Sequence, residues 1–102
     1  MSFGLTTEVT EKIRSVLSHH REVQSAILYG SRAKGNYKLG SDIDLTLVGE
    51  KLNLSKLAKI SDELDDLYLP YTFDFSIYDQ IENTQLLDHI KRVGTVFYSA
   101  KQ

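Results

Sequence analysis

Two short segments of the chain alternate between apolar and polar residues, and they constrain the fold more than any other feature. The first covers residues 42–48 and the second covers residues 72–77. The apolar positions of the two segments are Ile43, Leu45, Leu47, Phe73, Phe75 and Ile77. A period of two predicts a β-strand that buries one face and leaves the other polar.

A helical stripe lies between these two segments. Over residues 54–68 apolar side chains recur at helical spacing, and Pro70 soon follows. The residues of this stripe are Leu57, Ile60, Leu64, Leu67 and Tyr68. Another helix is expected over residues 6–18, where Thr6 or Thr7 can act as the N-cap. Helices and strands in this order are typical of an α/β layered domain.

The remaining segments complete this α/β (α+β) order. Residues 25–29 form a short apolar run, which predicts a buried strand. A further helix is expected over about residues 80–92, begun by a capping box of Asp79 and Glu82. Residues 96–98 are expected to add an edge strand. The prediction is a small mixed sheet with helices packed on it.

Composition restricts the function classes that remain. The 102 residues are expected to form one domain, and the absence of cysteine excludes thiolate metal sites and thiol catalysis. The formal net charge of −2 gives no field that would draw the chain onto nucleic acid, so no direct nucleic-acid binding is expected. Because no signal peptide and no spanning apolar run are visible, we expect a cytoplasmic protein without membrane contact.

A glycine-rich turn follows the apolar run at residues 25–29. Its sequence is Gly-Ser-Arg-Ala-Lys-Gly at residues 30–35. A strand that ends in a glycine and a short turn can direct backbone N–H groups at a phosphate, with a hydroxyl and two cations beside them. A turn with solvated charges is the alternative interpretation.

Three aspartates stand on the predicted polar faces of the alternating strands. Asp42 and Asp44 are two residues apart, so their Cα atoms are expected about 7 Å apart on one face. Asp74 occupies a polar position of the later strand and can reach this pair if the strands are neighbours. A solvated sheet surface explains each aspartate alone. Together they favour a site for hard cations such as Mg²⁺, with enough ligands for two ions.

In combination these motifs resemble those of a known enzyme family. The Gly-Ser-Arg-Ala-Lys-Gly segment, the Ser-Asp-Ile-Asp-Leu segment at residues 41–45 and the later strand aspartate are similar to the nucleotidyltransferase superfamily related to DNA polymerase β. More narrowly, they resemble its minimal members, the MNT-domain proteins that occur as antitoxins beside HEPN-domain toxins. The resemblance covers nearly the whole chain and implies a polymerase-β-like core.

The resemblance implies a metal-dependent transfer of AMP from ATP to a hydroxyl, with release of pyrophosphate. Two Mg²⁺ ions are implied as cofactors. The residues implied to bind the phosphates are Gly30, Ser31, Arg32 and Lys34. The residues implied to hold the metal ions and to act in catalysis are Asp42, Asp44 and Asp74, of which the last also orients or deprotonates the acceptor hydroxyl.

The acceptor is expected to be another protein in a hetero-oligomer. Family members that modify antibiotics or RNA carry an additional helical domain, whereas the catalytic core here is expected to use the whole chain. The resemblance implies a HEPN-domain ribonuclease toxin that is AMPylated on tyrosine and thereby silenced. Two alternatives stay open: an antitoxin that neutralises its partner by binding alone, and a free-standing nucleotidyltransferase for small molecules.

The other polar residues receive structural interpretations. His19 and His20 are expected at the end of the first helix, where cations suit the dipole. His89 is interpreted as an ordinary helical residue, because no cysteine or second histidine stands at ligand spacing. Four tyrosines are interpreted as buried or half-buried, with stacking on an adenine as the alternative; they are Tyr37, Tyr68, Tyr71 and Tyr78.

Overall fold

The structure is a computed structural model that describes residues 2–100; residues 1, 101 and 102 of the expected domain lie outside this range. The helical elements are α1 (Thr7–Ser18), α2 (Ser31–Lys34), α3 (Leu54–Asp65), the 3-10 turn η1 (Tyr78–Gln80) and α4 (Thr84–Val93). The strands are β1 (Ser25–Tyr29), β2 (Ile43–Val48), β3 (Phe73–Ile77) and β4 (Thr95–Ser99). The strands expected from the sequence are therefore confirmed, each to within one residue at its ends.

The strands form one mixed sheet in the order β3-β2-β1-β4. β2 and β3 are parallel and are joined by α3, whereas β1 pairs antiparallel with both β2 and β4. The register sets Asp44 opposite Asp74 on β3 and opposite Tyr29 on β1. The predicted mixed α/β fold is confirmed.

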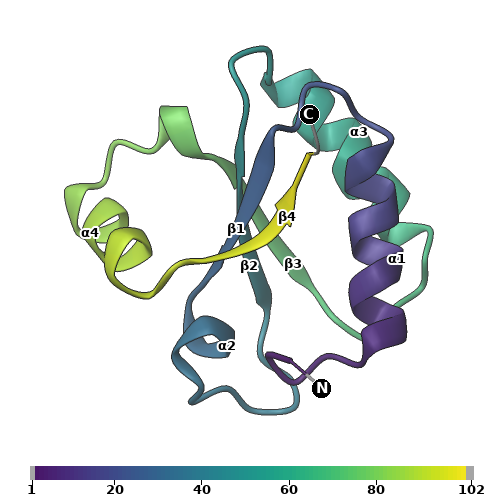
Figure 1. Cartoon of the computed structure of the whole chain (residues 1–102), viewed down its shortest axis with the longest axis vertical. Helices are drawn as coiled ribbons and strands as arrows, with labels where there is room; N and C mark the ends of the chain where they lie inside the picture. Colours follow the sequence, from purple (N-terminus) through teal and green to yellow (C-terminus); the bar gives the residue numbers. More distant parts are fainter. Residues whose placement is uncertain (1, 101–102) are drawn as a thin grey trace.

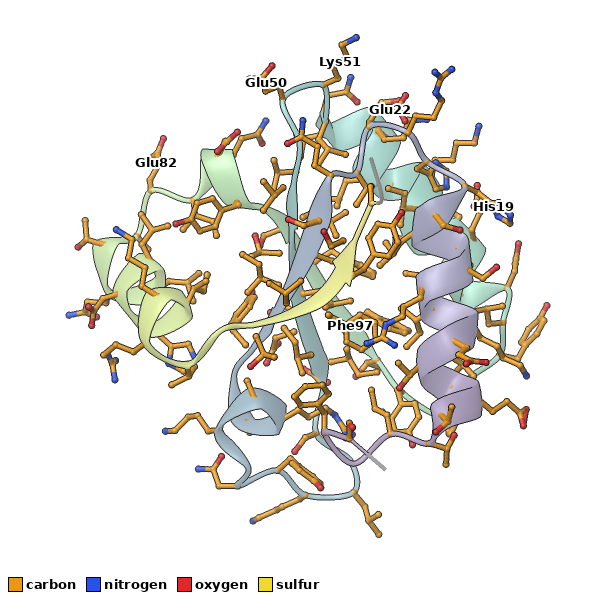
Figure 2. The ribbon with its side chains drawn as sticks, viewed as in Figure 1. His19, Glu22, Glu50, Lys51, Glu82 and Phe97 are labelled. Carbon is orange, nitrogen blue, oxygen red and sulfur yellow. The ribbon has the colours of Figure 1, made fainter. Side chains whose placement is uncertain are left out.

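Helices α1 and α3 lie on one side of the sheet and α4 lies on the other (Figure 1). The core between the sheet and the first pair includes Ile43, Leu45 and Leu47, which are fully buried. Phe97 of β4 lies toward α1 (Figure 2), where the Nε of Arg14 donates to its carbonyl oxygen at 2.7 Å. Within the described residues, no helix has the length and apolar character needed to cross a membrane.

Helix α4 begins later than the sequence pattern predicts. The side chain of Asn83 accepts a hydrogen bond from the Leu86 N–H at 3.0 Å and is the N-cap. The expected capping box of Asp79 and Glu82 is wrong, because Asp79 lies in η1, which closes with a bond from the Ile81 N–H to the Tyr78 carbonyl. The expected first residues of the helix therefore belong to the separate turn η1 and to the segment that joins it to α4.

His20 links the end of α1 to α3. Its side chain is buried, and its Nε2 lies 2.8 Å from Oε1 of Glu63. This hydrogen bond is the main cause that lowers the pKa of the Glu63 carboxyl. His19 caps α1 and stays exposed, so the two adjacent histidines differ in role.

Tyr68 does not belong to the buried stripe that the sequence predicts. Helix α3 ends at Asp65, and Tyr68 follows with φ +53° and a side chain that is 88% exposed. Its N–H bonds to the Asp65 carbonyl, so the residue closes the helix in the left-handed conformation that usually favours glycine.

We expect Tyr68→Gly to raise the free energy of unfolding by about 0.5–1 kcal/mol, because glycine adopts this conformation without the Cβ clash of an L-residue. Urea denaturation measures the change. Tyr68→Ala is the matched control, because it removes the ring but keeps Cβ. An equal gain in both variants would assign the effect to the exposed ring instead of the backbone.

Candidate functional site

Two carboxylates and a phenol meet on the face of the sheet that points away from α1 and α3. Asp44 of β2 stands between Tyr29 of β1 and Asp74 of β3 in the register. Neighbouring strands lie about 5 Å apart, so the two carboxylates are adjacent. Burial is the main cause that raises the pKa of the Tyr29 phenol, and the charges of Asp74 and Asp44 add to it.

Negative charge is concentrated at Asp44. Its pKa is raised from 3.8 to about 6, first by burial and then by the charges of Asp74 and Asp42, while the charge of Arg32 acts in the opposite direction. A hard divalent cation prefers oxygen ligands and would remove this repulsion. The donor set at this position therefore fits Mg²⁺.

Asp42 is held slightly apart from the other two aspartates. It lies just before β2, is exposed, and its Oδ1 accepts a hydrogen bond from the Oγ1 of Thr72. Over residues 2–100, no three histidine or acidic side chains are grouped closely enough to hold a metal ion. The register thus sets Asp44 opposite Asp74, while the Asp42 carboxylate bonds to the Thr72 hydroxyl.

The glycine turn packs directly against this acidic pair. Gly30 has φ +75°, a conformation that favours glycine, and a Cβ there would displace the Asp44 carboxylate, whose Oδ2 it would overlap. The chain then forms the short helix α2 and leaves it through Gly35 at φ +90°. Ser31 is the half-buried first residue of α2, and Lys34 is exposed.

Arg32 has a different place from the one expected at the phosphates. The side chain is 2% exposed, and its Nε and Nη2 donate to the Ser41 carbonyl while Nη1 donates to the Phe3 carbonyl at 2.8 Å. The rings of Tyr37 and Tyr71 lie 5.4 and 5.0 Å from the guanidinium carbon. Because its donors face backbone carbonyls, Arg32 anchors the turn, and these two tyrosines enclose it.

His89 of α4 is a neighbour of the site that sequence reasoning missed. Its Nε2 accepts a hydrogen bond from the Gly30 N–H at 3.1 Å. Its ring meets the Tyr29 ring edge-on, with centroids 6.1 Å apart. Gly30 and His89 are 59 positions apart, so no local spacing pattern predicts this contact.

A surface pocket of about 500 Å³ lies away from these residues. It is lined by Arg21, Glu22, Gln24, Glu50 and Lys51. Glu22, Glu50 and Lys51 stand at the end of the sheet remote from α2 (Figure 2). Its charges have both signs and it contains no aspartate of the acidic pair, so the candidate site is the carboxylate cluster beside α2.

Sequence comparison identifies the family of this arrangement. The family model described as "Polymerase beta, Nucleotidyltransferase" matches residues 11–102. The match includes the glycine turn and all three aspartates. A search of curated proteins found no significant match.

Solved structures share the fold at low sequence identity. A toxin–antitoxin crystal structure with AMP-PNP matches with a TM-score of 0.72 and 20% identity, over 91% of this chain and 75% of that chain. A Shewanella oneidensis complex of a tri-AMPylated HEPN toxin with an MNT antitoxin matches with a TM-score of 0.69 and 16% identity, over 94% and 74%. A putative nucleotidyltransferase from Sulfolobus solfataricus matches with a TM-score of 0.51 and 18% identity, over 90% and 78%.

We expect Arg32→Ala to lower the free energy of unfolding by about 3 kcal/mol, because buried carbonyl groups lose their charged donor. Urea denaturation checks this value. Lys34→Ala, which removes an exposed cation from the same short helix, should change stability by less than ~0.5 kcal/mol. Equal losses in the two variants would contradict the anchoring role.

Asp44→Asn should stabilise the metal-free protein at alkaline pH. A carboxyl whose pKa is higher in the folded state contributes stability below pH 3.8, and that stability is lost as the pH rises through about 6. Asparagine cannot ionise, so we expect a gain of about 1 kcal/mol at pH 8, after allowance for solvent screening of a half-buried group.

Chemical denaturation with EDTA at pH 8 and at pH 3.5 measures this difference. The gain should vanish at pH 3.5, where the wild-type carboxyl is neutral in the folded protein. A gain of the same size at both pH values would show that the substitution acts through packing instead of charge.

Proposed function

This chain belongs to the polymerase-β nucleotidyltransferase family, and we propose that it transfers AMP from ATP to a hydroxyl group of a partner protein. The observation that carries the proposal is the register of β2 and β3, which sets Asp44 opposite Asp74 next to the Gly30 turn. The proposal includes the expectation that residues 1–102 act as one minimal catalytic domain in the cytoplasm.

ATP is the proposed substrate, and residues 30–35 are its proposed phosphate-binding turn. The Ser31 hydroxyl and the first N–H groups of α2 are suitable donors, because N–H groups at a helix start lack partners within the helix. Gly30 keeps the approach free of side-chain atoms, and Lys34 adds an exposed positive charge. Arg32 acts through the shape of the turn that it anchors.

Asp42, Asp44 and Asp74 are the proposed ligands of two Mg²⁺ ions. The repulsion that helps to raise the pKa of Asp44 supports this assignment, because a cation is what would relieve it. Asp42 can join the others once its carboxylate leaves the Thr72 hydroxyl. When bound, Mg²⁺ would neutralise the negative charge that develops on the transferred and leaving phosphate groups.

The proposed step is an in-line displacement at the α-phosphorus of ATP. The acceptor oxygen forms a bond to this phosphorus while the bond to the pyrophosphate oxygen breaks. Asp74, exposed on the outer strand β3, is the residue proposed to orient the acceptor hydroxyl and take up its proton.

The proposed acceptor is a tyrosine hydroxyl of a HEPN-domain toxin, within a complex of the two proteins. Support comes from the fold shared with toxin–antitoxin structures, one of which contains a tri-AMPylated HEPN toxin. The exposure of Asp42 and Asp74 supports the same proposal, because it leaves the carboxylates open to a large acceptor.

A second candidate function is neutralisation of the partner by binding alone. The fold shared with toxin–antitoxin complexes supports it as well, because formation of a complex can by itself neutralise a toxin. In this alternative the site binds nucleotide or stays idle, and surface contacts inactivate the toxin.

Incubation of the protein with ATP, Mg²⁺ and a co-encoded HEPN-domain protein should add one or more AMP groups to the partner, as detected by intact-mass spectrometry. Asp42→Asn and Asp44→Asn should abolish the mass addition, because each removes one proposed metal ligand. Asp62→Asn makes the same chemical change at an exposed position of α3, which lies on the other side of the sheet from the candidate site. This control variant should leave the reaction intact.

The toxin assay separates the two candidates. Neutralisation without added mass, achieved equally by wild type and Asp42→Asn, would establish binding alone and overturn the transferase proposal. Neutralisation that requires both ATP and the aspartates would exclude binding alone.

A further inference from the structure

We propose that His89 is a positioning residue for the phosphate-binding turn: its imidazole holds the Gly30 peptide in place from the opposite helix, α4. This inference rests on the proposed function, because it assigns the turn to nucleotide phosphates. His89 lies outside the sequence segments that carry the family resemblance, and it contacts the turn only through the tertiary structure.

The first support is the direction of the hydrogen bond. The Gly30 N–H donates to Nε2 of His89 at 3.1 Å, so this ring nitrogen acts as the acceptor. The edge-on contact with Tyr29 fixes the plane of the same ring. The imidazole therefore contacts both residues that join β1 to the turn.

The second support is the confinement of Gly30 on its other side. Its Cα lies so close to Asp44 that a Cβ would overlap the carboxylate. The Gly30 peptide is thus held between an acceptor on α4 and a proposed metal ligand on β2. A change in its orientation would move the start of α2 relative to the acidic pair.

The third support is that α4 packs against β1 at the end that follows His89. Ile90 is buried, and its carbonyl accepts the Gly94 N–H at 2.7 Å where the helix ends. A Cβ at Gly94 would also press on the Ile27 side chain of β1, so the helix end lies close to the sheet. Because the end of α4 packs against β1, the imidazole can hold the turn relative to the sheet.

The chemistry explains why such an anchor matters. Displacement at phosphorus requires the phosphates to be aligned with the attacking oxygen, and a shift of 1 Å can cost about 100-fold in rate. Arg32 anchors the middle of the turn through the Ser41 and Phe3 carbonyls. His89 supplies the matching anchor at its beginning.

Three variants test the inference in the full-length protein. His89→Leu keeps the bulk and removes the acceptor. His89→Gln keeps an acceptor, because its amide oxygen can reach the place of Nε2. Lys91→Ala changes an exposed residue of the same helix and is the matched control.

The first measurement is amide hydrogen exchange at Gly30 by NMR in the nucleotide-free protein. We expect at least fivefold faster exchange in His89→Leu, and wild-type exchange in His89→Gln and Lys91→Ala. The second measurement is titration with a non-hydrolysable ATP analogue and Mg²⁺, in which His89→Leu should bind about tenfold more weakly and His89→Gln should recover most of the affinity. Thermal unfolding of each variant confirms that it is folded.

Unchanged Gly30 exchange in a folded His89→Leu variant would overturn the inference. Loss of nucleotide affinity that His89→Gln does not rescue would overturn it as well, because the acceptor would then not be the relevant property. If the wild type binds the analogue but transfers no AMP, the transferase proposal fails, while the predicted pattern of exchange and affinity would still establish His89 as a positioning residue.

Discussion

The parallel pairing of β2 with β3 is the constraint on which the rest of the structure depends. It sets Asp44 beside Asp74, although like charges opposite each other destabilise a sheet. The pairing persists because the other face of β2 buries Ile43, Leu45 and Leu47, and each buried side chain contributes roughly 1.5–3 kcal/mol. A slip of one residue would expose this apolar set, so the core fixes the register and imposes the repulsion at the site.

The glycine turn is held against this acidic pair by two sets of part-buried polar contacts. Arg32 bonds to backbone carbonyls from the middle of the turn, and the Gly30 N–H bonds to His89 at its start. In the part of the chain that the structure describes, no buried side-chain nitrogen or oxygen lacks a hydrogen-bond partner. Such contacts hold the turn in a defined position, which is the preorganisation that the proposed phosphate binding would use.

Local patterns predict the strands well and the helix ends less well. Alternation identifies β2 and β3 because it reflects backbone geometry within a few residues. The ends of α3 and the start of α4 depend on single hydrogen bonds, such as the one that Asn83 accepts from Leu86, and several residues compete for each of them. Tyr68 has an apolar ring at helical spacing, yet the helix ends before it and leaves it in solvent.

The sequence by itself determined that Asp44 and Asp74 stand on the polar sides of strands, that Asp42 directly precedes one of them, and that a glycine turn follows β1. Only the tertiary structure decided which partners these groups meet: Thr72 for Asp42, 30 positions away, and His89 for Gly30, 59 positions away. It also set the buried Arg32 side chain against the Ser41 and Phe3 carbonyls, contacts that no local pattern predicts. The reason is physical, because spacing within a strand follows from backbone geometry, whereas contacts between elements follow from how the whole core packs.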